Sequence, residues 1–397
     1  MSVRKRLWPD PVTGPNQAWI ADYVDGTGKR QRKQFRLKKE AEAFLLTART
    51  EVRDGNHVAD TASAMVSEAG ELWIAARTRA GREQTTIEQY RQHLDLHIKP
   101  LIGNQKLTGL SAPVLRKFED DMLDSGRSAA MVRKVLVSLG SLLSDAQERG
   151  LVARNIVRDM RGRRGTSDRR AEKRAKGRLK VGVDIPAPFE IKAIVQALEG
   201  RWRPLLLTAI FTGLRASELR GLTWANVDLD KKLIHVRERA DRFAVIGKPK
   251  SDAGERDVPI PPIIISTLKE WKTNGTKSAS GLVFPNLRGD PQALQPIVRD
   301  GFMPAQLRAG VAIMAIPPEG GEPVAIAKYS GMHALRHFYA SWCINSREDG
   351  GLGLPPKVVQ ERLGHSSITM TMDTYGHLFP RGDDSEELAA AEALLLG

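Results

Sequence analysis

The feature that most constrains the fold is a block of charge from Arg161 to Lys180. Ten of its twenty residues are basic, two are acidic, and almost none is apolar. A block of this composition cannot bury enough apolar surface to fold alone. It therefore predicts a linker over residues 161–185 with folded parts on either side, so the chain is expected to be multidomain.

The size and charge of the chain agree with this division. It has 397 residues, 41% of them hydrophobic, which is enough for two or three domains with cores of their own. Lysine and arginine number 61 against 47 acidic residues, giving a net charge of +14. Such an excess favours a polyanionic partner, nucleic acid above all, although a basic solvated surface would give the same sum.

Cysteine usage and hydropathy exclude several classes of protein. Cys343 is the one cysteine of the chain, so an internal disulfide framework or cysteine metal cluster is excluded, and a packed core thiol is expected. Residues 1–10 lack the apolar stretch of a secretory signal, and no window approaches the roughly 18 apolar residues of a membrane span. We expect a cytoplasmic protein with no membrane partner.

Residues 1–60 are predicted to form a small α+β domain. Strand patterning covers Ala18–Val24 and Arg30–Leu37, and a helix is expected from about Lys38 to Arg53. In the second strand Arg30, Arg32 and Arg36 share one face. A basic strand face suits a groove of duplex DNA, where arginine reaches base edges, while an edge strand with protective charges is the alternative.

Residues 62–160 have the apolar spacing of helices almost throughout, which predicts an all-α bundle of four helices. Pro100 and Gly103 are expected to end the second helix, and Ser111 with Pro113 to open the third. Residues 186–397 predict a mainly α domain. Strand patterning within 228–260 adds a small antiparallel sheet, and helices are expected to dominate from there to the end.

Four short motifs in this last part carry side chains suited to attack on a phosphodiester. They are Thr212-Gly213-Leu214-Arg215, a glycine- and charge-rich turn around Lys250, His333-Ala334-Leu335-Arg336, and the stretch from Leu363 to Tyr375. Such an attack needs cations on the non-bridging oxygens, a nucleophile, and an acid for the leaving oxygen. The planar guanidiniums of Arg215 and Arg336 match phosphate geometry.

Local patterns suggest how these side chains are presented. Gly213 should end a helix before Arg215, and Glu218, one turn along, is expected to hold the guanidinium, unless the two form an ordinary surface pair. Gly364 should likewise end a helix and leave His365 on the following turn. His333 and His337 have the spacing of a zinc helix. However, Ala334 stands where such a helix carries its glutamate, so no metal is expected.

Taken in this order, the motifs resemble those of the tyrosine recombinases, the phage-integrase family. The resemblance is strong over Thr212–Leu219 and His333–Tyr375 and is one of architecture alone before residue 180. It implies an arm-type DNA-binding domain over 1–60, a helical core-binding domain over 62–160, and the tyrosine recombinase catalytic fold over 186–397. One departure is Arg154-Asn155-Ile156, where relatives commonly have Asn-Pro, which bears on where the linker starts.

The resemblance also implies a role for each side chain. Tyr375 would be the nucleophile, leaving a 3′-phosphotyrosyl enzyme and a free 5′ hydroxyl. Arg215 and Arg336 would hold the phosphate, and His333 and His365 would support proton transfer and oxygen contacts. A lysine would protonate the departing 5′ oxygen. The flanking residues of the turn select Lys250, with Lys248 as the alternate.

A site-specific recombinase that integrates or excises a phage or mobile element follows from this resemblance, with no cofactor and no metal. The implied partners are double-stranded attachment sites, three further copies of the chain in a tetramer on DNA, and accessory bending and excision or directionality proteins. DNA contacts are expected from basic side chains of the first domain and the linker: Arg30, Arg32, Arg36, Arg161, Arg163, Arg164, Arg169 and Arg170.

Two alternatives share this scaffold. One is an enzyme like a tyrosine topoisomerase, which uses the same chemistry without strand exchange. The other is a non-catalytic DNA-binding regulator, which predicts broken catalytic positions, whereas all six are present in this chain.

Overall fold

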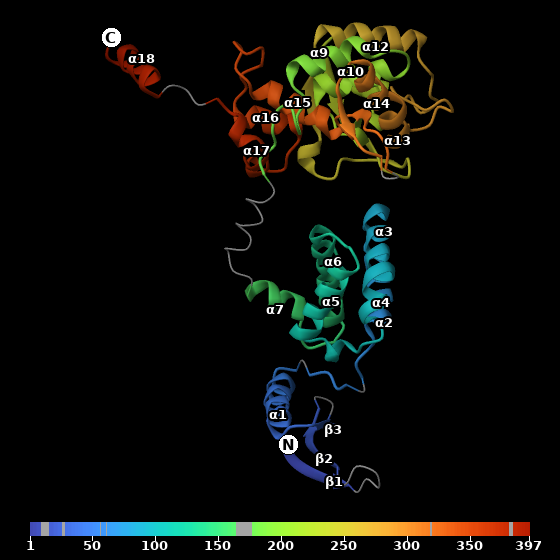
Figure 1. Ribbon diagram of the computed structural model, residues 1–397, viewed down its shortest axis with the longest axis vertical. Coiled ribbons are helices and arrows are strands. Elements are labelled where there is room, and N and C mark those ends of the chain that lie inside the picture. Colours follow the sequence, from blue (N-terminus) through green and yellow to red (C-terminus); the bar gives the residue numbers. More distant parts are fainter. Residues whose placement is uncertain are drawn as a thin grey trace. The chain divides into compact units, whose positions relative to one another are not determined.

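The structure is a computed structural model of the chain and describes residues 1–397 apart from 9–15, 26–27, 56, 61, 164–176, 318–319 and 381–383. It divides into two compact units, Met1–Ala175 and Lys176–Gly397. In Figure 1 the colours run from blue to green along the first unit and from green to red along the second. Their boundary falls inside the predicted linker, and the finer division into domains stays a prediction. The described residues are rich in helix and carry small antiparallel sheets, as expected.

The first unit begins with a three-stranded antiparallel sheet of order β1-β2-β3. Its strands are β1 (Ser2–Trp8), β2 (Asn16–Val24) and β3 (Arg30–Phe35), and α1 (Lys38–Arg53) follows. Strand β1 was not predicted, because its mixture of basic and apolar residues gives a weak alternating signal. Ala21 and Tyr23 of β2 pack against Ala41 and Leu45 of α1, so the helix covers one face of the sheet.

Residues 66–163 contain the four expected helices and one more, α7, and the second of the four runs unbroken from α3 through a π-helical turn (Leu94–Ile98) into α4. The helices are α2 (Val66–Arg79), α3 (Gln84–His93), α4 (Lys99–Ile102), α5 (Ala112–Asp124), α6 (Ala129–Glu148) and α7 (Ile156–Arg163). Pro100 does not end a helix, because the helical backbone continues through it from the π-helical turn into α4, which ends before Gly103 as expected. Trp73, Phe118 and Leu139 are fully buried in the core of this bundle.

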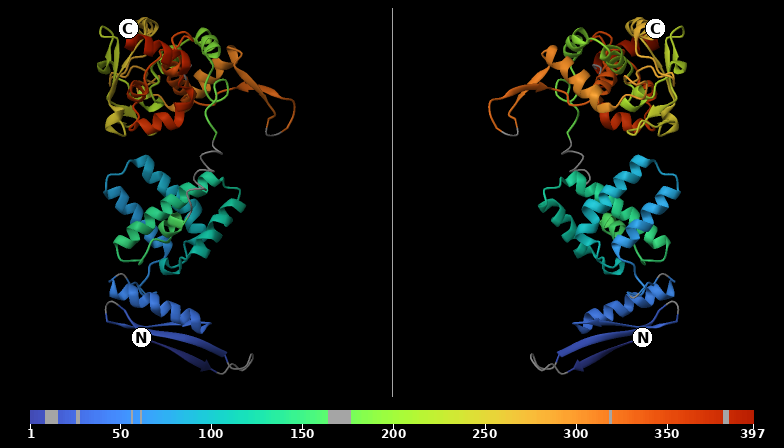
Figure 2. Two further views of the ribbon diagram at one scale, coloured as in Figure 1. Left: turned by 90° about the vertical axis from the view of Figure 1, so that its left-hand side faces the viewer. Right: turned by 90° about the vertical axis from the view of Figure 1, so that its right-hand side faces the viewer.

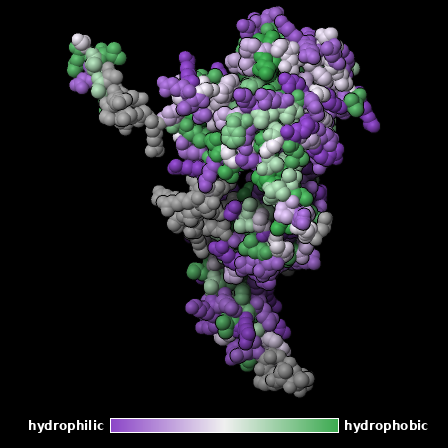
Figure 3. All heavy atoms as spheres, turned by 45° about the horizontal axis from the view of Figure 1, so that its top comes forward, coloured by the Kyte–Doolittle hydropathy of each residue, from purple (hydrophilic) through white to green (hydrophobic). Residues whose placement is uncertain are grey.

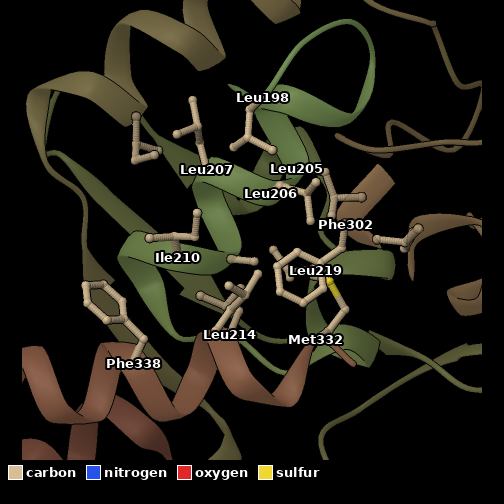
Figure 4. Close-up of a cluster of buried hydrophobic side chains, with 14 of the residues drawn as sticks. Leu198, Leu205, Leu206, Leu207, Ile210, Leu214, Leu219, Phe302, Met332 and Phe338 are labelled. Atoms are coloured by element: carbon tan, nitrogen blue, oxygen red, sulfur yellow. The ribbon is translucent and has the colours of Figure 1, made fainter. Parts of the chain in front are cut away.

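Several helices of the second unit contribute residues to its largest core. The helices of the unit are α9 (Pro188–Ala197), α10 (Trp202–Thr212), α11 (Ala216–Arg220), α12 (Pro262–Asn274), α13 (Leu294–Pro296), α14 (Met303–Arg308), α15 (His333–Ile344), α16 (Pro356–Leu363), α17 (Ile368–Tyr375) and α18 (Asp384–Leu396). Figure 4 shows Leu206 and Ile210 of α10 in this core, with Phe302, Met332 and Phe338 contributed by other segments. Apolar residues all round α10 thus fix the base from which Gly213 and Arg215 extend.

Two small sheets and a hairpin complete this unit. One sheet has the order β4-β5-β8, from Val227–Asp228, Leu233–Val236 and Arg256–Pro259, and β6 (Arg239–Ala240) pairs with β7 (Ile246–Gly247). Strands β9 (Ala312–Ala315) and β10 (Val324–Ala327) form a hairpin that stands out in orange in Figure 2. Helices were expected to dominate here, and the hairpin corrects that expectation.

Polar side chains predominate on the face drawn in Figure 3, with apolar ones scattered between them. No described helix is long and apolar enough to cross a bilayer.

Candidate active site

Arg215 lies in a sharp turn between two helices. Helix α10 ends at Gly213, whose φ of +61° is in the left-handed region, and Arg215 is the N-cap of α11. A Cβ at Gly213 would lie 2.3 Å from the Tyr339 ring, so this position accepts only glycine. The turn was predicted from the sequence, and it sets Arg215 beside the buried end of α10.

Glu218 holds Arg215 as expected. Its Oε1 accepts from Nη1 of Arg215 at 2.7 Å, and its Oε2 accepts from the Arg215 backbone N–H at 2.8 Å. The other guanidinium nitrogen, Nη2, donates to the carbonyl oxygen of Gly364 at 2.9 Å. Since the Glu218 side chain is only 2% exposed, the pair is not an ordinary surface ion pair.

Arg256, at the start of β8, was missed as a site residue. Its guanidinium donates to both carboxylate oxygens of Glu218 and to the backbone oxygens of Gly254 and Arg362. Burial alone would raise the pKa of Glu218. Hydrogen bonds and charge from Arg256, together with the charge of Arg215, outweigh burial and lower this pKa to about 2. The carboxylate therefore stays ionised between two arginines.

Arg336 on α15 and Arg215 both bind backbone carbonyls at the end of α16. The Arg336 side chain is buried and donates to the carbonyl oxygens of Gly213, at 2.7 Å, and Leu363, at 2.5 Å. Leu363 precedes Gly364, so the two guanidiniums bind neighbouring carbonyls. Burial and the Arg215 charge lower the pKa of Arg336 to about 9, and the side chain is still cationic at neutral pH.

His365 follows the predicted helix end at Gly364, where φ is +62°. Gln360 fixes its backbone, because the Gln360 carbonyl accepts from the His365 N–H and the Gln360 side chain donates to the His365 carbonyl. The His365 Nδ1 lies 2.9 Å from Oγ1 of Thr371, both side chains being buried. Burial and the charges of Arg336 and Arg215 lower the pKa of His365 to about 4, so the ring is neutral at pH 7.

Tyr375 ends α17 and is 1% exposed. Its ring is parallel to that of His365, at 3° and 6.4 Å between centroids. Its hydroxyl lies 2.7 Å from Nδ1 of His337, a contact that links α17 to α15. Burial raises the pKa of Tyr375 to about 12 against the opposing charge of Arg336, so the phenol is protonated at neutral pH.

His337 was considered only as a zinc ligand and rejected, so its contact with Tyr375 was missed. Its ring packs edge-on against that of His333, 4.6 Å between centroids. Burial, His333 and Arg336 lower the pKa of His337 to about 4. His333 is more open to solvent, yet the surrounding protein atoms still displace part of its hydration, and this effect, with the Arg336 and Arg215 charges, lowers its pKa as well.

Lys250 lies on an exposed turn between β7 and β8, and Lys248 is exposed as well. The turn reaches the site through Ala253: a Cβ on Gly364 would lie 2.8 Å from the Ala253 carbonyl oxygen. Arg256 continues the same segment into the Glu218 pair. The predicted lysine therefore belongs to a segment that Arg256 anchors to Glu218, the partner of Arg215.

His377, two residues after Tyr375, connects the same helix end to the start of the unit. Its Nε2 lies 2.7 Å from the carbonyl oxygen of Leu179. Leu179 also packs against the cluster that contains Tyr375.

The predicted basic face of the first sheet carries an acid at its centre. Asp22 of β2 accepts from Nε and Nη2 of Arg30, both at 2.7 Å, and lies 3.6 Å from Nε of Arg32 and 3.9 Å from Nη2 of Arg4. The Arg30 hydrogen bond, and then the charges of Arg30, Arg32 and Arg4, outweigh partial burial and lower the pKa of Asp22. Its cover consists of these arginine side chains, which are themselves more than half exposed.

Other predicted DNA contacts are placed only in part. Arg36 is exposed beyond the end of β3. Arg161 and Arg163 lie in α7, where the structure describes the backbone but not these side chains, and Arg164, Arg169 and Arg170 lie outside the described residues.

Two cations, a phenol and three imidazoles thus come together from four segments around Leu363 and Gly364. Two guanidiniums beside a hydroxyl suit the binding of a tetrahedral oxyanion next to a nucleophile.

Comparisons with known proteins agree with this chemistry. Residues 187–381 match the model of the phage integrase family. The chain is 26% identical over 393 residues to a tyrosine recombinase XerC-like protein of Caldanaerobacter subterraneus subsp. tengcongensis, with 90% of both chains covered. Its fold is similar to that of the Tn1549 transposon integrase in complex with a circular intermediate DNA (TM-score 0.60, 18% identity, 84% of this chain and 100% of that chain). It is also similar to lambda integrase, solved as a tetramer bound to a Holliday junction (TM-score 0.53, 17% identity, 91% and 96%).

Proposed function

The chain is a site-specific tyrosine recombinase of the phage integrase family, and from this premise we propose that Tyr375 cuts and rejoins attachment-site DNA through a 3′-phosphotyrosyl intermediate. The proposal includes integration and excision of a phage or mobile element. The observation that carries it is the meeting of Arg215 and Arg336 at the neighbouring carbonyls of Gly364 and Leu363, with the Tyr375 helix packed beside them.

The proposed reaction needs no cofactor. The Tyr375 Oη forms a bond to the scissile phosphorus as the bond from phosphorus to the 5′ oxygen breaks. Arg215 and Arg336 neutralise charge on the non-bridging oxygens, and Lys250 gives a proton to the departing 5′ oxygen. A 5′ hydroxyl from a second strand then gives its proton to the neutral Lys250 and attacks the phosphotyrosine. This step releases Tyr375, so the bond energy is kept throughout.

His333 and His365 are proposed to contact the phosphate oxygens. Both are neutral at pH 7 because their pKa values are lowered, so each ring can donate an N–H without adding charge. The bond from Thr371 to Nδ1 of His365 fixes the orientation of that ring. His365 is therefore held in one orientation before the phosphate binds.

Glu218 and Arg256 are positioning residues in this scheme. They touch Arg215 and its anchoring segment rather than the reacting atoms.

DNA is the proposed partner of both units. The arginines around Asp22 form a face with a net positive charge, suited to a duplex groove, and the linker block is suited to the phosphate backbone. Recombination between two duplexes is proposed to use a tetramer, as in the lambda integrase complex. Bending and excision or directionality proteins are proposed as further partners. Because its substrate is DNA, we propose that the enzyme acts in the cytoplasm of the host cell.

The test is covalent capture. A short direct repeat that brackets the gene and its neighbouring mobile genes identifies the attachment site, and a nicked duplex of that site traps the cut strand on the enzyme. The wild-type chain should migrate as a protein–DNA adduct, whereas Tyr375→Phe should bind the duplex equally well and form none. Tyr90→Phe, in the first unit, is the matched control. Adduct formation by Tyr375→Phe would refute the mechanism.

A further inference from the structure

The scheme above leaves one proton without a destination. Tyr375 has a protonated phenol, and a neutral phenol is a weak nucleophile until its proton moves to an acceptor. The hydroxyl is on a side chain with 1% exposure, so bulk water has little access to it. A protein group close to Oη is therefore required.

The described contacts of the three imidazoles distinguish them. The ring of His333 packs edge-on against that of His337, 4.6 Å between centroids. Nδ1 of His365 is bonded to Thr371, and the His365 ring lies parallel to the phenol rather than in line with its hydroxyl. His337 is the imidazole within hydrogen-bond distance of Oη, at 2.7 Å from Nδ1, with its ring inclined by 64° to that of Tyr375.

A neutral imidazole has two tautomers, and in the one with its proton on Nε2 the Nδ1 of His337 accepts from the Tyr375 hydroxyl. In that tautomer the lone pair that takes the phenol proton points at it.

We propose that His337 holds the Tyr375 hydroxyl and accepts its proton during attack on the scissile phosphate. This inference rests on the proposed function. In the step, the O–H bond of Tyr375 breaks as the bond from Oη to phosphorus forms, and the proton moves to Nδ1 of His337. The bond from phosphorus to the 5′ oxygen breaks at the same time, and a second proton moves from Lys250 to that oxygen. The proton on His337 returns to Tyr375 when strand transfer releases the phenol.

The charges around His337 fit an acceptor that becomes effective when DNA binds. On its own helix, His333 and Arg336 lower its pKa, and Asp184, from the segment before α9, raises it, while Tyr375 faces it from α17. A phosphodiester between Arg215 and Arg336 brings a negative charge that opposes the effect of Arg336. The pKa of His337 is then expected to rise towards neutrality, where a general base is most effective.

The experiment compares His337→Asn with wild type in the full-length chain, cutting the nicked attachment-site duplex under single-turnover conditions. An asparagine amide can accept a hydrogen bond near the position of Nδ1 but does not take a proton at neutral pH. We expect cutting to slow by about 10²–10⁴-fold, the usual range for loss of a general base. His235→Asn, on β5 with a partner in Asp257, is the matched control and should cut at the wild-type rate.

A second substrate separates the base from the acid. A duplex with sulfur in place of the scissile 5′ oxygen has a leaving group that needs no proton. With this duplex the cutting rate of Lys250→Ala should return towards that of wild type, and the cutting rate of His337→Asn should stay low. If the sulfur duplex restored the cutting rate of His337→Asn, His337 would help to protonate the leaving 5′ oxygen instead. A wild-type rate for His337→Asn would leave it a simple hydrogen-bond partner, and a faster rate would make the contact a restraint on Tyr375. Each of these three results overturns the proposal.

Two further measurements keep the test decisive. If His337→Asn does not fold, wild type cutting the sulfur duplex should still be slower in D2O, because the phenol proton moves in the same step. No isotope effect there would contradict the proposal. If wild type forms no adduct at all, the proposed function fails. If wild type forms one and His337→Asn matches it, only this inference fails.

Discussion

Glu218 and Arg256 form a two-pronged ion pair, with Nη2 2.8 Å from Oε2 and Nη1 3.1 Å from Oε1. Both side chains are almost completely buried, and Arg256 also binds the backbone of Gly254 and Arg362. The pair therefore joins the segment that follows Lys250, the helix that carries Arg215, and the end of α16.

Glu218→Gln should lower the free energy of unfolding by about 3–5 kcal/mol, because it leaves the buried Arg256 charge without its partner. Urea denaturation of the full chain measures this difference. Glu361→Gln, which removes the exposed partner of Lys357, is the matched control and should change it by about 0–1 kcal/mol. Equal effects of the two substitutions would contradict the role given to the junction.

The same pair predicts a pH dependence. The pKa of Glu218 is lowered from 4.5 to about 2 in the folded chain, so its ionised form contributes stability above pH 4.5. That contribution should decline as pH falls from 4.5 towards 2. Unfolding free energies measured between pH 6 and pH 3 should therefore converge for wild type and Glu218→Gln at the acid end, and a constant gap would count against this assignment.

Lys250→Ala should slow cutting by about 10²–10⁴-fold if this lysine is the general acid. A duplex with sulfur at the scissile 5′ position should recover most of the loss, as measured by adduct formation with time. Lys248→Ala should cut both duplexes at the wild-type rate. The reverse pattern would transfer the acid function to Lys248.

Gly364→Ala should impair folding more than its backbone angle alone requires. The residue has a φ of +62°, and an added Cβ would lie 2.8 Å from both the Ala253 carbonyl oxygen and Nη1 of Arg256. We expect a loss of about 3 kcal/mol or more in unfolding free energy, with loss of cutting. Gly310→Ala has a φ of +69° and nothing within 4 Å of its Cβ, so about 1–2 kcal/mol is expected. Similar losses at the two positions would refute the steric argument.

Asp22→Asn should weaken sequence discrimination by the first sheet. It adds one positive charge, which favours binding to any duplex, but it releases Arg30 and Arg32 from a fixed arrangement. Fluorescence anisotropy with arm-site and scrambled duplexes should show a smaller ratio of affinities than wild type. Asp300→Asn removes a surface partner of Arg299 and adds the same charge, and it should leave that ratio unchanged.

Much of the fold followed from periodicity. The helix expected from about Lys38 to Arg53 lies at those residues, and the glycine turns at Gly213 and Gly364 are present. Strands β9 and β10 were not predicted because both their faces are apolar. No alternation of polar and apolar residues distinguishes them from a buried helix. Proline at 100 was given too much weight as a helix terminator.

The site divides in a similar way. Motifs indicated Arg215, Arg336, His365 and Tyr375, and the structure gathers them, while their roles stay predictions. Arg256 and His337 were missed because their partners are distant in sequence: the hydroxyl bonded to His337 is 38 residues away. His333, four residues earlier on the same helix, suggested a metal-binding helix instead. The spacing of residues along one helix does not indicate which side chains of another helix they contact.

The end of α16 has one more consequence. Its last carbonyls carry the negative pole of a helix dipole, and they hold two guanidiniums that would otherwise repel each other. The repulsion between the two guanidiniums is thus offset when the chain folds, before DNA binds. A change at this helix end should consequently alter the rate of DNA cutting and the thermal stability of the chain in the same direction.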